Sequence, residues 1–178
     1  SNIKSTMVKV IERIKKIKSH DYYLHIAMSP TKNIDRFEWF LEKSTEIGID
    51  EITPIICNRS ERKTIKTNRC QKILISAIKQ SLKYHLPKLN ECLLFEDFIQ
   101  KNTKSKKYIA HCQKRKRIKL KNQKINKETL ILIGPEGDFS PKEIELAFQN
   151  QFKAVSLGTS RLRTETAGII AVHTINIK

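Results

Sequence analysis

The feature that most constrains the fold of this 178-residue chain is a regular alternation of short apolar segments and amphipathic segments. The apolar segments lie at residues 22–28, 51–57, 106–112, 129–134 and 153–158, and each has the length of one β-strand. Helical periodicity marks residues 33–48, 67–84, 140–150 and a closing segment from about residue 164. Strands that alternate with helices are typical of a parallel sheet. We therefore predict an α/β fold, with a mostly parallel sheet and helices on both faces.

The first 18 residues do not fit this alternation. Ser1 and Asn2 are typical of the scar of a cleaved tag, and residues 4–18 ("KSTMVKVIERIKKIK") are predicted to be a basic linker or the last strand of a neighbouring domain. Residues 19–178 are predicted to form one domain, which is long enough to bury a core.

The charge of the chain favours a polyanionic partner. The sequence has 35 Lys and Arg against 18 Asp and Glu, a net charge of +17. Residues 101–127 contain twelve Lys or Arg and no acid, so this run is predicted to be either a solvated loop or a phosphate-binding segment. An AT-rich genome would also enrich Lys and Ile, so charge alone leaves both interpretations open.

Arginine is more informative than lysine because the planar guanidinium suits phosphate and carbonyl oxygens. Seven of the nine arginines fall in three groups, within residues 59–69, 115–117 and 161–163. Arg59, Arg62, Arg115 and Arg117 are therefore candidates for contacts with RNA phosphates, although solvated loops would have the same composition.

Two loops that follow predicted strands share an unusual composition. They are "LILIGPEGDFSPKE" (130–143) and "SLGTSRLRTETAG" (156–168), and each passes from an apolar strand through glycine into the start of a helix. Ligands of open α/β sheets bind at the carboxyl ends of the strands. Gly134, Gly137 and Gly158 are thus predicted either to let the backbone approach a ligand or to make tight turns.

Several other classes of site are excluded by their missing motifs. The chain has no GxGxxG, no GxxxxGK[ST], no GxSxG and no HExxH pattern. Its four cysteines and five histidines lack zinc-ligand spacing, so we predict no metal. Scattered single cysteines suit a reducing cytosol, and no segment is long and apolar enough to predict a membrane span.

The two loops also carry a family resemblance. "LIGPEGDFSPKEIELA" followed by "LGTSRLRTETA" resembles the C-terminal motifs of the ribosomal RNA small subunit methyltransferase E family, which are SPOUT-class enzymes. "DRFEWFLEKSTEIGIDEITPIICNRS" and "AIKQSLKYHLPKL" resemble its earlier segments, so the similarity covers about residues 20–178. Asp138 departs from the pattern, where the family usually has glycine, and so do Lys79 and Lys83, where it has an acidic residue and an arginine.

The resemblance implies a fold, a reaction and partners. It implies a C-terminal trefoil knot, S-adenosylmethionine as methyl donor, and methylation of N3 of a uridine in 16S rRNA or the small ribosomal subunit. It further implies a cytoplasmic homodimer and an N-terminal RNA-binding barrel, of which this chain has at most the last strand.

The resemblance also implies which residues act. It assigns the cofactor site to the two loops and to apolar residues that would contact the adenine: Leu132, Ile133, Gly134, Pro135, Glu136, Gly137, Leu157, Gly158, Leu162 and Thr164. Arg163 and Arg161 would face the target base and stabilise negative charge on its carbonyl oxygens. The alternative for Arg163 is a salt bridge to Glu165 or Glu136 that only fastens the loop.

Two rival hypotheses remain open from the residues alone. The glycine-containing loops could hold another nucleotide, such as ATP or NAD. The charge could instead belong to a non-catalytic RNA-binding module, although the twelve aromatic residues fall mostly at core-periodic positions rather than on a stacking surface.

Overall fold

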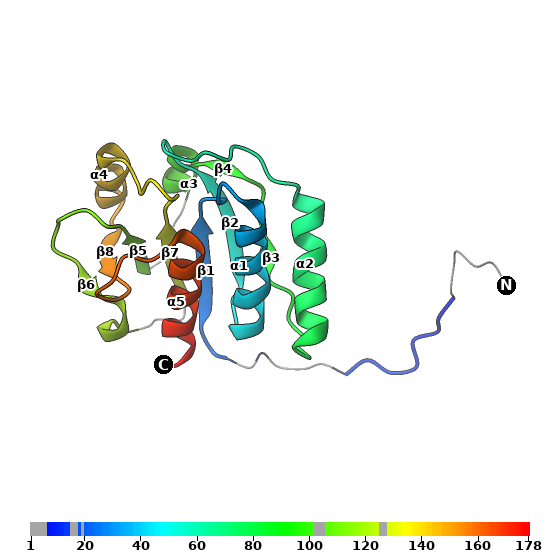
Figure 1. Cartoon of the computed structure of the whole chain (residues 1–178). Helices are drawn as coiled ribbons and strands as arrows, with labels where there is room; N and C mark the ends of the chain where they lie inside the picture. The colour runs from blue at the N-terminus through cyan, green and yellow to red at the C-terminus, as the bar shows by residue number, and fades with distance from the viewer. Residues whose placement is uncertain (1–6, 15–17, 19, 102–105, 125–127) are drawn as a thin grey trace.

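The structure is a computed structural model that describes residues 7–14, 18, 20–101, 106–124 and 128–178 (Figure 1). Its elements alternate along the chain as the periodicity predicted. In chain order they are β1 (Tyr23–Met28), α1 (Ile34–Ile47), β2 (Glu51–Ile56), α2 (Thr67–Gln80), β3 (Lys88–Leu89), β4 (Leu93–Leu94), α3 (Phe95–Lys101), β5 (Lys106–Ala110), β6 (Ile118–Lys119), the 3₁₀ turn η1 (Leu120–Asn122), β7 (Glu128–Ile133), α4 (Pro141–Gln149), β8 (Lys153–Ser156) and α5 (Thr164–Asn176).

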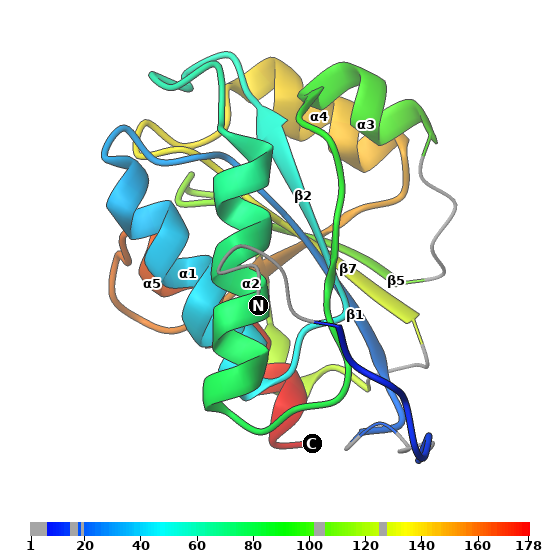
Figure 2. The same ribbon diagram turned by 90° about the vertical axis from the view of Figure 1, so that its right-hand side faces the viewer.

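The strands form one sheet in the order β3-β2-β1-β7-β5-β8-β6, and β4 pairs with the end of β2. Every strand pair in the described residues is parallel. Helices α1, α2 and α5 cover one face, and α3 and α4 cover the other (Figure 2). The predicted α/β fold, with helices on both faces of a parallel sheet, is confirmed.

The core follows from the alternation of side chains along each strand. On β1, Leu24, Ile26 and Met28 pack under α1, α2 and α5, whereas Ala27 points to the opposite face. That opposite face is filled by Ile109, Leu130, Leu132 and the aromatic side chains of α3 and the loop before α4. Central strands buried on both faces explain why β7 reads as a continuous apolar run.

Local sequence signals position α1 and α4 well. Asn33 caps α1 by accepting a hydrogen bond from the Asp35 N–H, and Gly48 ends the helix with φ 134°. Ser140 and Glu143 form the capping box of α4, with Pro141 in its first turn. Both boundaries lie within one residue of those predicted.

The short elements were not predicted. Strands β3, β4 and β6 have two residues each, which is too short for any periodicity, and α3 has only seven. Residues 7–14 form no helix or strand, while residues 1–6 and 15–17 of the predicted linker lie outside the described residues.

The C-terminal quarter of the chain packs against an earlier segment. Strand β8 inserts between β5 and β6, which belong to one earlier stretch of the chain. The Lys178 amino group then donates to the carbonyl oxygens of Leu120 and Gln123 in that same stretch. The trefoil knot itself stays a prediction. The start of α5 lies at the tips of β5 and β7.

Candidate active site

The carboxyl ends of the central strands meet at one edge of the sheet. Ile133 at the tip of β7 pairs with Met28 of β1 on one side and with Ala110 of β5 on the other. Ala110 in turn pairs with Val155 of β8. The two glycine-containing loops of β7 and β8 therefore leave from the same edge of the sheet, one on each side of β5.

These loops border a cavity of about 400 Å³, which we call the strand-tip cavity. Its volume lies in the range of about 300–1,000 Å³ typical of small-molecule sites. It is lined by Ala110, Cys112, Ile133, Gly134, Pro135, Glu136, Asp138, Arg161, Leu162, Arg163, Thr164 and Ala167.

A smaller hollow of about 70 Å³ continues from this cavity toward β8. The two spaces share Ala110, Cys112, Leu162 and Ala167 in their walls. The smaller hollow adds Leu157 and Gly158, so eight of the ten residues predicted to bind the cofactor line one space or the other.

Leu132 and Gly137 are the two that do not. Successive side chains of a strand point to opposite faces, so Leu132 lies in the core beneath α3 and α4 while Ile133 faces the cavity. Gly137 packs instead against Arg59, since a Cβ built on it would lie 3.2 Å from the Arg59 Cβ.

The three loop glycines have different surroundings, so the absence of a side chain has a different consequence at each. A Cβ on Gly134 would lie 3.0 Å from the Phe139 ring, so Gly134 lets the loop fold back onto that ring. A Cβ on Gly158 would have no neighbour within 4 Å, so a ligand could approach the backbone there. Among the glycines, all of which are described, only Gly48 has φ in the left-handed region. Close packing therefore accounts for Gly134 and Gly137, and open space distinguishes Gly158.

Arg161 and Arg163 are exposed and line the strand-tip cavity. Within the described part of the chain neither guanidinium has an ion-pair partner. The Glu165 Oε1 lies 3.8 Å from the Arg36 Nε, and the Glu136 Oε1 accepts a hydrogen bond from the Lys32 N–H at 2.9 Å. Neither of the two carboxylates that could have fastened Arg163 forms an ion pair with it, and Arg163 lines the cavity.

The four other candidate arginines hold loops together. Arg59 donates to the carbonyl oxygen of Gly137 at 2.9 Å, and Arg62 donates to those of Thr31 and Lys32 at 3.1 and 2.7 Å. These bonds tie the loops after β1 and β2 to the loop after β7.

Arg115 and Arg117 make comparable contacts in the loop after β5, and Arg117 lines the smaller hollow. Arg117 donates to the carbonyl oxygen of His111 at 2.6 Å. Arg115 lies 3.5 Å from the Glu145 carboxylate and over the Phe148 ring. A contact of any of these four arginines with RNA stays a prediction.

Asp138 fastens two walls of the cavity, a role that the sequence did not reveal. Its carboxylate accepts hydrogen bonds from the Cys112 N–H at 3.0 Å and the Phe139 N–H at 2.9 Å. Its φ of 64° is the conformation that glycine adopts most easily, which fits the expectation of a glycine here. The main-chain bonds compensate for that conformation.

The loop after β5 supplies cavity residues that the sequence analysis missed. Ala110 and Cys112 line the space because β5 is the parallel neighbour of β7, and the position of β5 in the sheet is the signal that would have found them. Between them, His111 is buried, and burial lowers the pKa of its imidazole, which is therefore neutral at pH 7.

The remaining features agree with a site built from loops and arginines. No group of three or more His, Cys, Asp or Glu side chains could hold a metal ion within the described residues. No helix in that part of the chain is long and apolar enough to cross a membrane. Lys79 is exposed on α2, which forms despite the departure at this position.

Comparisons with known proteins define the class. The sequence profile of the RNA methyltransferase domain matches residues 18–176. A probable rRNA-methyltransferase from Porphyromonas gingivalis superposes with a TM-score of 0.87 at 42% identity, over 92% of this chain and 71% of that one. The TrmH/SpoU tRNA modifying enzyme of A. aeolicus shares the fold alone, with a TM-score of 0.59 at 13% identity over 90% of this chain and 76% of that one. The fold is that of the SPOUT-type RNA methyltransferases.

Within that class the particular family is also clear. The ribosomal RNA small subunit methyltransferase E of Mesomycoplasma hyopneumoniae is 31% identical over 93% of this chain and 74% of its own length. The enzyme of the same name from Neisseria gonorrhoeae, solved with S-adenosyl methionine bound, superposes with a TM-score of 0.79 at 29% identity, over 88% of this chain and 66% of that one. This chain belongs to the ribosomal RNA small subunit methyltransferase E family. It spans 60% of the length of the Rickettsia conorii relative, so it corresponds mainly to the catalytic domain.

Proposed function

We propose that this domain transfers a methyl group from S-adenosylmethionine to N3 of a uridine in 16S ribosomal RNA. The observation that carries the proposal is the pair of cavity-lining arginines, Arg161 and Arg163, whose charges no described carboxylate neutralises. Family membership and the relative solved with S-adenosyl methionine support the choice of donor.

The residues present fit such a donor. The strand-tip cavity joins apolar surface from Ile133 and Leu162 to main-chain groups of the loop after β7, and the space beside Gly158 is open. That combination suits an adenosine, whose base packs on apolar groups and whose edges bond to the backbone. When bound, the donor supplies a methyl group activated on a sulfonium.

The chemical difficulty lies with the acceptor, because the imide N3 is protonated and weakly nucleophilic at neutral pH. The reaction releases that proton to water and leaves S-adenosylhomocysteine. Loss of the proton spreads negative charge onto the two carbonyl oxygens of the base. Arg163, at the start of α5, and Arg161 offer forked donors to those oxygens or to the adjoining phosphate. Fixed cationic donors of this kind stabilise developing charge without reorganisation.

A direct assay separates this proposal from its two rivals. We expect isotope-labelled methyl to pass from the donor to small ribosomal subunits that lack this modification, and nucleoside analysis to identify N3-methyluridine. Calorimetry should detect S-adenosylmethionine but neither ATP nor NAD. Binding of ATP or NAD alone would favour another nucleotide-binding enzyme, and RNA binding without methyl transfer would favour a non-catalytic module.

We also propose that the working form is a cytoplasmic homodimer that pairs through α5. Thr166, Ile170, His173 and Ile177 recur at helical spacing and remain partly or fully exposed, and Ile177 is 67% exposed. A second copy would cover this stripe. Sedimentation should give twice the chain mass, and Ile170→Asp should reduce it to one chain.

A further inference from the structure

A second cavity lies at the same edge of the sheet, on the side of α3 and α4. It has a volume of about 440 Å³, and we call it the flanking cavity. The loop after β2, the start of α3 and the start of α4 form its walls, in the upper part of Figure 1. Neither the arginines nor the loop glycines line it, so the proposed reaction does not use it.

One segment separates the flanking cavity from the strand-tip cavity. Residues 134–136 and Asp138 border the strand-tip cavity, and Ser140 and Lys142 border the flanking cavity. Arg59 holds this segment through its 2.9 Å bond to the carbonyl oxygen of Gly137. Because Asp138 and Ser140 are two residues apart, at most about 7 Å of chain lies between the two spaces.

The floor of the flanking cavity is apolar. The ring of Phe95 is buried there, Leu146 is half-buried, and the side chain of Leu94 is 58% exposed at the rim. The face of a nucleobase is flat and apolar, and it packs on apolar side chains such as those of this floor. The side chain of Asn58 is exposed beside the floor and offers both a donor and an acceptor to a base edge.

The charged residues of the lining are two lysines and two glutamates. Lys63 and Lys142 are exposed there, and neither forms an ion pair with any described residue. Glu96 is the one exposed carboxylate in the lining. The buried Glu143 accepts hydrogen bonds from the N–H groups of Asn58 and Ser140, so its oxygens are already engaged by the backbone. The lysines, rather than the capped end of α4, are therefore the groups of this lining that are free to contact an anion.

We propose that the flanking cavity binds a nucleotide of the RNA strand next to the methylated uridine. The base lies on the apolar floor beside Asn58, and the phosphate lies between Lys63 and Lys142. This inference rests on the proposed function, because the strand is held in register only if its uridine occupies the strand-tip cavity. The two exposed lysines without an ion pair, and the short separation of the two cavities, favour RNA over a ribosomal protein as the occupant.

The first test compares two double variants that each remove two lysines. Lys63→Ala/Lys142→Ala should raise the KM for unmodified small subunits by about tenfold and reduce the salt slope of RNA binding by about 1 to 2. Its affinity for S-adenosylhomocysteine should not change. The control, Lys72→Ala/Lys153→Ala, removes exposed lysines that line neither cavity, and it should behave as the wild type.

The second test identifies the occupant. A photoreactive p-benzoylphenylalanine in place of the exposed Leu94 should cross-link, on irradiation, to the nucleotide adjacent to the methylated uridine. A cross-link to a ribosomal protein, or to RNA distant from that uridine, would overturn the proposal. So would an unchanged KM in the first double variant. Absence of methyl transfer by the wild type would instead refute the proposed function itself, so the two failures are distinguishable.

Discussion

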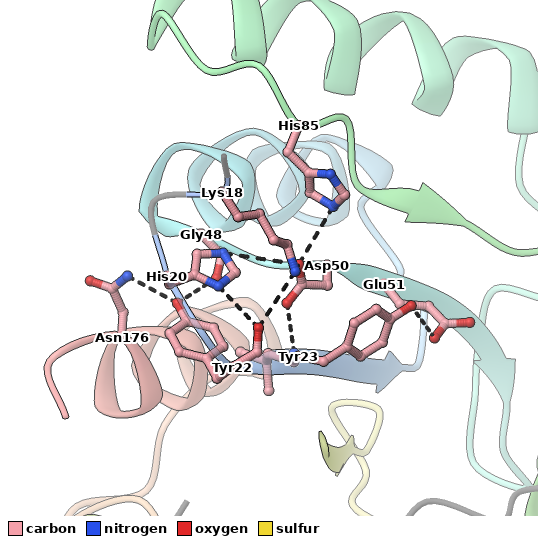
Figure 3. Close-up of polar contacts among 10 residues, drawn as sticks. Lys18, His20, Tyr22, Tyr23, Gly48, Asp50, Glu51, His85 and Asn176 are labelled. Carbon is pink, nitrogen blue, oxygen red and sulfur yellow. Dashed lines mark hydrogen bonds and ion pairs between the residues drawn. The ribbon is translucent and has the colours of Figure 1, made fainter. Parts of the chain in front are cut away.

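The two ends of the parallel sheet place charged side chains in opposite environments. At the amino end, Asp50 and Glu51 are buried carboxylates surrounded by donors (Figure 3). At the carboxyl end, Arg161 and Arg163 are exposed cations with no ion pair to a described residue. Because burial of a charge requires compensation and exposure does not, the first arrangement stabilises the fold and the second leaves charge available for a substrate.

Asp50 contacts groups from two other segments of the chain. One carboxylate oxygen accepts the Leu24 N–H at 2.8 Å. The other pairs with the Lys18 amino group and lies 3.5 Å from the His85 ring and 3.9 Å from that of His20. These contacts connect the segment before β1 and the segment after α2 to the start of β2.

Glu51 is held in the same manner. Burial alone would raise the pKa of its carboxyl group, but the charge of His25 and hydrogen bonds from Asn90, Tyr23 and Lys88 outweigh it and lower the pKa to about 2. The Tyr23 hydroxyl donates at 2.9 Å and the Asn90 amide at 2.8 Å. This network keeps Glu51 ionised inside the fold.

The largest effect is expected from a cation of the carboxyl end. Arg163→Ala should reduce the rate of methyl transfer by about 100- to 1,000-fold, because a preorganised donor to the charged base is lost. Its unfolding free energy should stay within about 0.5 kcal/mol of the wild type, since Arg163 is exposed. Arg69→Ala is the matched control, because Arg69 is exposed but paired with Glu38 on α1. Undiminished turnover of Arg163→Ala would contradict the claim that the exposed cations of the carboxyl end serve the substrate.

Removal of a carboxylate at the amino end should lower stability and leave the rate of methyl transfer unchanged. Asp50→Ala should lower the free energy of unfolding in urea by about 3 kcal/mol, because it leaves the Leu24 N–H and the Lys18 charge without their acceptor. The rate per folded molecule should be unchanged. Asp21→Ala, at an exposed aspartate of the neighbouring segment, should have almost no effect. A loss below about 1 kcal/mol for Asp50→Ala would mean that the polar network does not stabilise the fold.

A smaller effect is expected in the pH dependence of the free energy of unfolding, to which Glu51 at the amino end should contribute. The folded pKa of Glu51, about 2, lies below its ordinary value of 4.5, so its contribution is present above pH 4.5 and is lost as the pH falls toward 2. That loss should be on the order of 2 kcal/mol. Unfolding of Glu51→Gln, followed by circular dichroism across this pH range, should depend less on pH than that of the wild type. Equal slopes for the two proteins would contradict the assignment.

The sequence predicted the long elements because periodicity and capping act locally. Asn33, Gly48 and the Ser140–Glu143 box fix their helix ends through bonds within a few residues. The insertion of β8 between β5 and β6 could not be derived in this way, since sheet order depends on contacts far apart in the chain. The trefoil knot is implied by the family resemblance and not by periodicity.

The candidate site also has features that the sequence could predict and features that it could not. Arg163 and the loop after β7 were predictable because their motifs are contiguous in sequence. The bond between Asp138 and the Cys112 N–H, and those from Arg59 and Arg62 to distant carbonyl oxygens, join loops that only the folded sheet brings together. Gly134 shows what sequence composition cannot resolve. Its close contact with Phe139 requires glycine for packing, and a glycine that approaches a ligand would look the same in the sequence.

The most direct test of the account is a calorimetric titration of S-adenosylhomocysteine into the wild type and Gly158→Val. Because nothing lies within 4 Å of a Cβ at this position, the variant should keep the melting temperature of the free wild-type protein. The wild type should bind one ligand per chain and melt at a higher temperature when it is bound. The new side chain should weaken that binding by about tenfold or more. Equal affinity of the two proteins, or no binding to the wild type, would contradict the claim that the methyl donor occupies the carboxyl end of the sheet.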